Sequence, residues 1–288
     1  MPILGIAMLG ICVGYVAGMF GIGGGFLLTP LLVAVFGVPL PIAVGTGLCQ
    51  MVGTSLVAFL RHRNASQGEI RFDLMMLPGS LLGVELGART LTLLGRAGNL
   101  HIGGVHVPWV NAVVETSYAA MLTFIAVNYW RHGGKKTDYL QQLRPGFLSK
   151  IQFGPSVQLP AVGLQVSPFV ITYIGLGLGF LSGLLGIGGG VALNPILIYG
   201  YGFPIRQSVG TGIVLLFATA VTGTFTHAMR GHVHLPLAMV MLTGASVTAQ
   251  IGANASRKMS GSSLGRIHSV VILAAIAAVL WDLVSKTR

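Results

Sequence analysis

The residues with the clearest capacity for chemistry form two glycine clusters, Gly21-Ile-Gly-Gly-Gly25 and Gly186-Ile-Gly-Gly-Gly190. Each interrupts an apolar stretch, where glycine adopts backbone angles that other residues avoid and leaves amide N–H groups uncovered. Such groups at the start of a helix bind anions, with help from the helix dipole. We therefore predict one central anion site whose backbone donors come from Gly23, Gly24, Gly25, Gly188, Gly189 and Gly190. The alternative is that the glycines only permit a kink and close packing.

Polar side chains near the clusters extend this predicted site. Thr29 and Asn194 follow the two clusters by about one helical turn. Thr46 and Gln50 share one face of the next helix, and Thr211 occupies the corresponding place in the second half. We assign all five to substrate binding, with hydrogen bonds within or between helices as the alternative.

Two carboxylates lie deepest in the predicted membrane segments, where an acidic side chain must be paired, hydrated or protonated. They are Glu85 and Glu115. One hypothesis is that one of them carries a coupling proton. The other is an acid paired with Arg89 or Arg96 near the membrane interface.

The chain offers little else for catalysis or metal binding. His227, His232 and His234 lie close together beside Arg230, but no cysteine or acid completes a metal set, so we expect solvated or headgroup-facing histidines. Neither glycine cluster fits a dinucleotide fingerprint, and no nucleophile–base arrangement is visible. We expect no metal, no cofactor and no enzymatic activity.

The composition indicates which elements position these residues. Only 8% of the 288 residues are charged, with seventeen basic and six acidic side chains, whereas a soluble domain has about 25%. A surface facing water cannot be covered with so few charges, so the sequence predicts an all-α integral membrane protein surrounded by lipid. The basic residues lie in short loops rather than along one stripe, which excludes nucleic acid as a partner and indicates topology signals.

Apolar stretches of about 20 residues or more predict about eight transmembrane segments. Their approximate ranges are 3–36, 41–60, 74–94, 111–130, 169–200, 205–226, 235–254 and 264–285. The first and fifth are too long for one crossing, and each has a glycine cluster near its middle. Each is either two half-helices or a spanning helix followed by a re-entrant half.

Eight crossings place most basic residues on one face, which includes Arg61, Arg71 and Arg230 and should be cytoplasmic. This predicts an inner-membrane protein with both termini in the cytoplasm. The run 99–108 alternates around a Gly-Gly pair, which predicts a hairpin with His101 opposite His106. We divide the chain into a first repeat, 1–130, a cytoplasmic linker, 131–168, and a second repeat, 169–288.

The two halves are an internal repeat, because a shift of 165 residues superposes them across their first two segments without a gap. The shift aligns both glycine clusters, both Val-Gly-Thr-Gly motifs (44–47 and 209–212), and the series Gly10, Gly14, Gly18 with Gly175, Gly179, Gly183. Duplicated halves with broken helices are typical of secondary transporters. Four crossings per half predict parallel rather than inverted repeats.

These motifs resemble the TauE/SafE family of membrane transporters, above all in the stretches 18–30 and 179–195 and in the two Val-Gly-Thr-Gly motifs. The resemblance covers nearly the full length. It implies an inner-membrane carrier that exports sulfite, sulfoacetate or related sulfur-containing anions. Asn194 in place of the first half's Thr29 and the 101/106 histidine pair depart from it.

The sequence therefore predicts an ion-coupled secondary transporter working by alternating access, with a small anion and membrane lipid as partners; a homo-oligomer is compatible with it. The alternatives are a channel-like or regulatory anion-binding protein and an importer of a related organic anion. A membrane enzyme is disfavoured.

Overall fold

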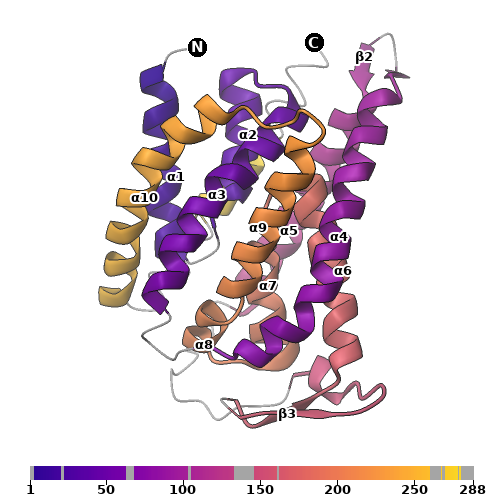
Figure 1. Ribbon diagram of the computed structural model, residues 1–288, viewed down its shortest axis with the longest axis vertical. Coiled ribbons are helices and arrows are strands. Elements are labelled where there is room, and N and C mark those ends of the chain that lie inside the picture. Colours follow the sequence, from indigo (N-terminus) through magenta and orange to yellow (C-terminus); the bar gives the residue numbers. More distant parts are fainter. Residues whose placement is uncertain are drawn as a thin grey trace.

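The computed structural model shows a bundle of long helices with a small strand pair at each end (Figure 1). It describes residues 3–20, 23–62, 68–102, 105–132, 146–160, 162–259, 267, 270–277 and 279. Within these residues four helices have the length and apolarity of membrane spans, namely α1, α3, α6 and α10. The mostly helical fold agrees with the predicted all-α membrane protein.

The described residues of the first half form five helices and one hairpin. Its elements are α1 (Ile3–Phe20), α2 (Gly25–Phe36), α3 (Leu40–His62), α4 (Ile70–Arg96), β1 (Asn99–Ile102), β2 (Val105–Pro108) and α5 (Trp109–His132). The antiparallel register of β1 and β2 places His101 opposite His106, which confirms the predicted hairpin.

The second half follows a connection that contains the short helix η1 (Leu148–Lys150) and the antiparallel pair β3 (Val157–Leu159) and β4 (Leu164–Val166). Its helices are α6 (Pro168–Leu185), α7 (Gly190–Pro195), the π-helical turn η2 (Ile196–Tyr201), α8 (Ile205–Gly210), α9 (Ile213–Ala228) and α10 (Leu235–Lys258). Residues 270–277, within the predicted last segment, are also helical. The ends of that segment lie outside the described residues. The domain boundaries stay a prediction.

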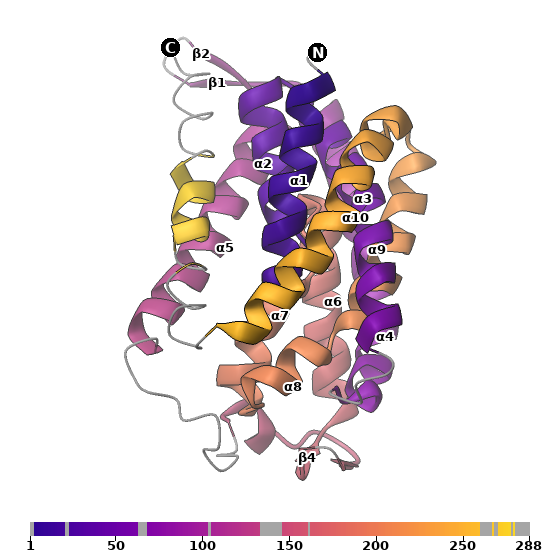
Figure 2. The same cartoon turned by 90° about the vertical axis from the view of Figure 1, so that its left-hand side faces the viewer.

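The first and fifth segments are broken at the glycine clusters, as predicted. After the first break α2 returns to the end of the bundle where α1 begins, and both lie in the same half of the molecule (Figures 1 and 2). Gly24 packs back against α1, since a Cβ there would lie 2.9 Å from Ala17 Cβ and Val13 Cγ1. The break therefore forms a hairpin of two helices.

The repeats are inverted, which corrects the prediction of parallel repeats. α1 begins at the end that carries β1 and β2, whereas α6 begins at the opposite end, beside β3 and β4 (Figure 2). The cause is the hairpin at the first break, which returns the chain to the end where α1 begins, so that the three helices α3, α4 and α5 carry it to the opposite end (Figures 1 and 2). The eight-crossing layout is accordingly not confirmed: α3 and α9 end at opposite ends of the bundle, although that layout puts Arg61 and Arg230 on one face.

The two halves are held together because the first helix of each half packs against the last long helix or the fourth helix of the other half, α1 on α10 and α6 on α4. The glycines of α1 pack on α10: a Cβ on Gly10, Gly14 or Gly18 would lie within 2.8 Å of the backbone of Met241, Ala245 and Ala249 respectively. The glycines of α6 pack on α4 in the same way, at Met76, Ser80 and Val84. The shift of 165 converts one set of contacts into the other residue by residue. The small-residue ridges predicted from sequence thus join each half to the other.

One break was not predicted. The segment 205–226 divides into α8 and α9 at Thr211 and Gly212, whose φ of 94° is left-handed. The buried carboxylate of Asp73 accepts hydrogen bonds from the backbone N–H groups of Gly212 and Val214, at the start of α9. The corresponding segment of the first half, α3, is continuous, and Ala238 occupies the position equivalent to Asp73. Asp73 therefore has no acidic counterpart in the second half, and this difference accounts for the break between α8 and α9 and for the continuity of α3.

Candidate functional site at the paired helix breaks

The two glycine clusters meet in the middle of the bundle. A Cβ on Gly25 would lie 2.4 Å from the carbonyl oxygen of Gly186, so the backbones of the two clusters are in contact. Gly23 lies against Met51, the middle residue of α3, which places the break at half the depth of that helix. The structure therefore brings together the two breaks that the sequence placed in one site.

Both returning helices begin with left-handed glycines. Gly23 and Gly24 have φ values of 83° and 71°, and Gly188 and Gly189 have 67° and 77°. These pairs direct the chain into Gly25, the first residue of α2, and Gly190, the first residue of α7. The N–H of Gly25 donates to the carbonyl of Gly23 at 2.9 Å, so this expected donor is already used.

The space between the clusters is filled by two apolar side chains, Met51 and Leu216. A Cβ on Gly23 would lie 2.6 Å from Met51 Cε and 3.0 Å from Leu216 Cδ1, and a Cβ on Gly188 would meet the same two atoms at 2.0 Å and 2.9 Å. Met51 and Leu216 are equivalent under the repeat. Sequence reasoning expected only polar groups here and missed both residues, although the 165-residue shift pairs them.

Hydroxyl groups from neighbouring helices hold the backbone of the clusters. Tyr118 on α5 donates to the carbonyl of Leu185 at 2.9 Å and lies 3.4 Å from the carbonyl of Gly25. Thr219 on α9 lies 3.3 Å from the carbonyl of Gly188 and 2.8 Å from that of Leu215. Tyr118 was also missed, and its spacing of three residues from Glu115 on the same helix was the available signal.

Three other predicted polar residues, Thr29, Asn194 and Gln50, are buried and lie in different helices. Thr29 lies beside the second cluster, because a Cβ on Gly186 would be 3.0 Å from its Oγ1. Asn194 is buried in α7. Gln50 is 1% exposed, and its Oε1 has no hydrogen-bond partner among the described residues.

Thr46 and Thr211 tie the two halves together near opposite ends of the bundle. The Oγ1 of Thr46 accepts from the backbone N–H of His234 at 3.0 Å, and the Oγ1 of Thr211 accepts from that of Glu69 at 2.9 Å. The shift of 165 relates both the threonines and their donors. The threonines of the two Val-Gly-Thr-Gly motifs thus hold the starts of α10 and α4, which matches the alternative of hydrogen bonds between helices.

A cavity of about 50 Å³ adjoins the first cluster on one side. It lies between α1, α3, α9 and α10, and its polar lining comes from Thr54, Ser55 and Gln250. Gly23 and Leu216 form its inner wall. The cavity therefore borders the first of the two breaks.

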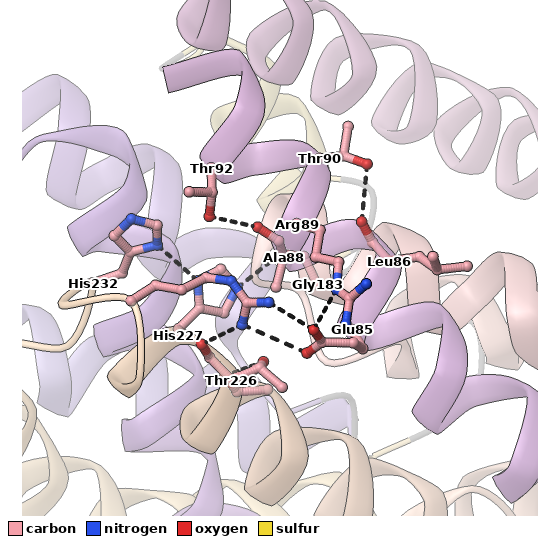
Figure 3. Close-up of polar contacts among 12 residues, drawn as sticks. Glu85, Leu86, Ala88, Arg89, Thr90, Thr92, Gly183, Thr226, His227 and His232 are labelled. Atoms are coloured by element: carbon pink, nitrogen blue, oxygen red, sulfur yellow. Dashed lines mark hydrogen bonds and ion pairs between the residues drawn. The ribbon is translucent and has the colours of Figure 1, made fainter. Parts of the chain in front are cut away.

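Glu85 lies on the side of the paired breaks away from this cavity, and it forms ion pairs with two arginines. Its carboxylate is 2.6 Å from Arg230 Nη2 and 2.7 Å from Arg89 Nε (Figure 3). The side chain of Glu85 is 30% exposed. Its pairing with Arg89 matches the second of the two alternatives given for it, and Arg230 is a partner that the sequence did not suggest. Glu115 is 5% exposed and lines a small cavity with Thr29 and Tyr118.

The expectation of solvated histidines holds for His234, which is exposed, but is wrong for His227. His227 is fully buried, with Nε2 2.9 Å from the carbonyl of Gly183 on α6 and Nδ1 3.2 Å from Nδ1 of His232 (Figure 3). A carbonyl only accepts, so His227 carries its proton on Nε2, and His232 donates to Nδ1. Burial, followed by the charge of Arg230, lowers the pKa of His232 and favours this neutral state.

An inverted repeat with broken helices meeting at mid-depth is the architecture of membrane transporters. Residues 6–279 match the family described as sulfite exporter TauE/SafE, and the chain belongs to this family. It is similar to the probable membrane transporter protein YunE of Bacillus subtilis, with 26% identity over 93% of both chains. It is also similar to YjnA of the same organism, with 28% identity over 93% of this chain and 96% of the relative, and to a probable membrane transporter protein of Methanocaldococcus jannaschii, with 24% identity over 93% and 91%. No solved structure matches significantly.

Proposed function

We propose that this membrane transporter is a secondary carrier that exports small sulfur-containing anions, such as sulfite, sulfoacetate or related sulfonates, across the inner membrane by alternating access. The supporting observation is the contact between the two glycine breaks, Gly25 against Gly186, with a cavity reaching the first break from one side. The substrate enters this cavity and passes between the breaks as the opposite side opens. The helix starts at Gly25 and Gly190 orient positive dipole ends toward it.

The test is uptake of sulfite, sulfoacetate, taurine and sulfate into liposomes that contain the purified protein. A carrier gives saturable flux and counterflow, whereas a channel does not saturate in the same range. The informative variant is Gly188→Ala, since Gly188 has a φ of 67° and a Cβ there would lie 2.0 Å from Met51 Cε. Gly37→Ala is its control, because φ is 63° there and a Cβ would meet nothing within 4 Å. We expect flux to be lost in the first variant only; absence of flux for all four anions in the unmodified protein overturns the substrate class.

Ion coupling is assigned to Glu115 in preference to Glu85. Glu115 is buried beside Thr29 and Tyr118, whereas Arg89 and Arg230 hold Glu85 as a carboxylate at the edge of the bundle. A coupling proton requires a group that changes its charge during the cycle. Glu115→Gln should therefore remove the pH dependence of flux, and Glu85→Gln should leave it. The opposite pattern assigns the role to Glu85.

A further inference from the structure

The surroundings of the paired breaks differ on their two sides, although the repeat makes them equivalent in sequence. On one side the cavity is lined by Ser55, Ile213, Ala249 and Ala253. The shift of 165 converts these into Ala220, Leu48, Val84 and Ala88 on the other side, all of which are 0% exposed, compared with 1% for Ser55, 4% for Ile213 and 8% for Ala249. A Cβ on Gly223 would lie 2.8 Å from Leu48 Cδ1 and 3.5 Å from Val84 Cγ1, so this side is packed.

Met51 and Leu216 lie where the cavity ends and the packed side begins. Leu216 lines the cavity, whereas Met51 is 0% exposed. Each touches the glycine of its own half and that of the other half, because both approach Gly23 and Gly188. Leu216 therefore closes the cavity beyond Gly23, and Met51 packs against the same two glycines without lining the cavity.

We propose that Met51 and Leu216 together form the barrier that separates the two sides of the transport path. The proposal rests on the proposed function in one respect, namely that a solute crosses between the glycine breaks. Apolar side chains suit this role, since they exclude water and bind no anion that would remain in the path. Methionine has three rotatable bonds and can withdraw without a backbone movement.

A substrate that moves from the cavity to the packed side must displace both side chains. A Cβ at position 23 or 188 would lie within 3.0 Å of both side chains while they are in this closed arrangement. Because Gly23 and Gly188 have no side chains, Met51 and Leu216 can occupy the space between them.

The experiment measures the accessibility of a cysteine on the packed side and does not depend on the substrate. Thr54 is 5% exposed and lines the cavity, whereas its equivalent, Thr219, is 2% exposed, lies beside Gly188 and does not line the cavity. Thr54→Cys and Thr219→Cys are introduced separately into a chain in which Cys12 and Cys49 are replaced by alanine. A hydrophilic thiol reagent is then applied to the detergent-solubilised protein.

We expect Thr54→Cys to react at least about tenfold faster than Thr219→Cys, because position 54 lines the cavity, whereas a thiol at position 219 reacts only after local opening. Adding Met51→Ala and Leu216→Ala should bring the Thr219→Cys rate close to that of Thr54→Cys, and each single truncation should give part of the increase. Met76→Ala and Leu215→Ala are the matched controls, since both are buried in a separate cluster with Phe72. They remove the same side chains without opening the path.

The proposal is overturned if Thr219→Cys stays protected in the double truncation while Thr54→Cys still reacts, which also shows that the variant is folded. It is equally overturned if the control pair exposes Thr219→Cys to the same degree, because the effect is then general loosening. Exposure in the double truncation without sulfite flux in the unmodified protein retains the barrier and rejects only the proposed substrate.

Discussion

The contact between α6 and α4 gives a quantitative prediction for two glycines on one helix. Gly179 faces the partner helix, and a Cβ there would lie 2.1 Å from the carbonyl oxygen of Ser80. Gly177 lies two residues away, and a Cβ there would meet nothing within 4 Å. Alanine at either position gains helix propensity of about 1 kcal/mol relative to glycine. This gain is common to both variants, so their difference measures the packing of the two helices alone.

An ordinary contact begins at 3.4 Å, so Gly179→Ala requires the helices to separate by about 1.3 Å along this contact. Overpacking of this kind costs about 1–3 kcal/mol. Gly177→Ala should therefore stabilise the protein by about 1 kcal/mol, and Gly179→Ala should be less stable than Gly177→Ala by about 1–3 kcal/mol. The measurement is reversible unfolding in mixed micelles, followed by helix content.

The repeat supplies an independent control. Gly14 is equivalent to Gly179, and a Cβ there would lie 2.4 Å from Ala245 Cα. Gly14→Ala should cost about as much as Gly179→Ala, since the two contacts are related by the same shift. The reasoning is refuted if Gly179→Ala proves as stable as Gly177→Ala, because the close approach of α6 and α4 then has no energetic consequence.

Three further perturbations follow from the contacts. Thr46→Val and Thr211→Val should each lower the free energy of unfolding by about 1–3 kcal/mol, because each leaves a backbone N–H without its acceptor; Thr243→Val, which loses only a bond within its own helix to Val240, should cost less in the same unfolding assay. Asp73→Ala should destabilise the protein by about 1–2 kcal/mol through loss of the cap on α9, and hydrogen exchange should rise at Gly212 and Val214 before it rises elsewhere. Glu85→Gln should cost no more than about 1 kcal/mol, since both partners are partly exposed, and a larger loss in unfolding experiments would contradict a screened ion pair.

The sequence predicted the elements that depend on local signals. Glycine clusters mark the breaks because their backbone angles are unavailable to other residues, and the alternation around Gly103 and Gly104 marks the hairpin. The repeat also predicted that the clusters meet, since equivalent features of a duplicated transporter gather at one interface. These inferences needed only spacing and residue type.

The orientation of the repeats could not be predicted, because it depends on whether one segment crosses the membrane or turns back. An 18-residue α1 is long enough for a crossing, so length does not decide the question. The packing of Gly24 against Val13 and Ala17 decides it, and this contact is tertiary. The role of Asp73 escaped for a similar reason, since it acts on a break more than a hundred residues away.

The departures from symmetry carry information about the transport cycle. A perfectly duplicated inverted repeat would form a cavity on either side with equal free energy, and the two states would be equally populated. Here Glu85 pairs with Arg230 on the packed side, whereas the equivalent Gln250 lines the cavity and carries no charge. In the mechanism proposed above, an ion pair present on one side only stabilises the closure of that side. We therefore expect Glu85→Gln to shift the population toward the opposite-facing state and to raise the labelling rate of Thr219→Cys while leaving that of Thr54→Cys at or below its original value.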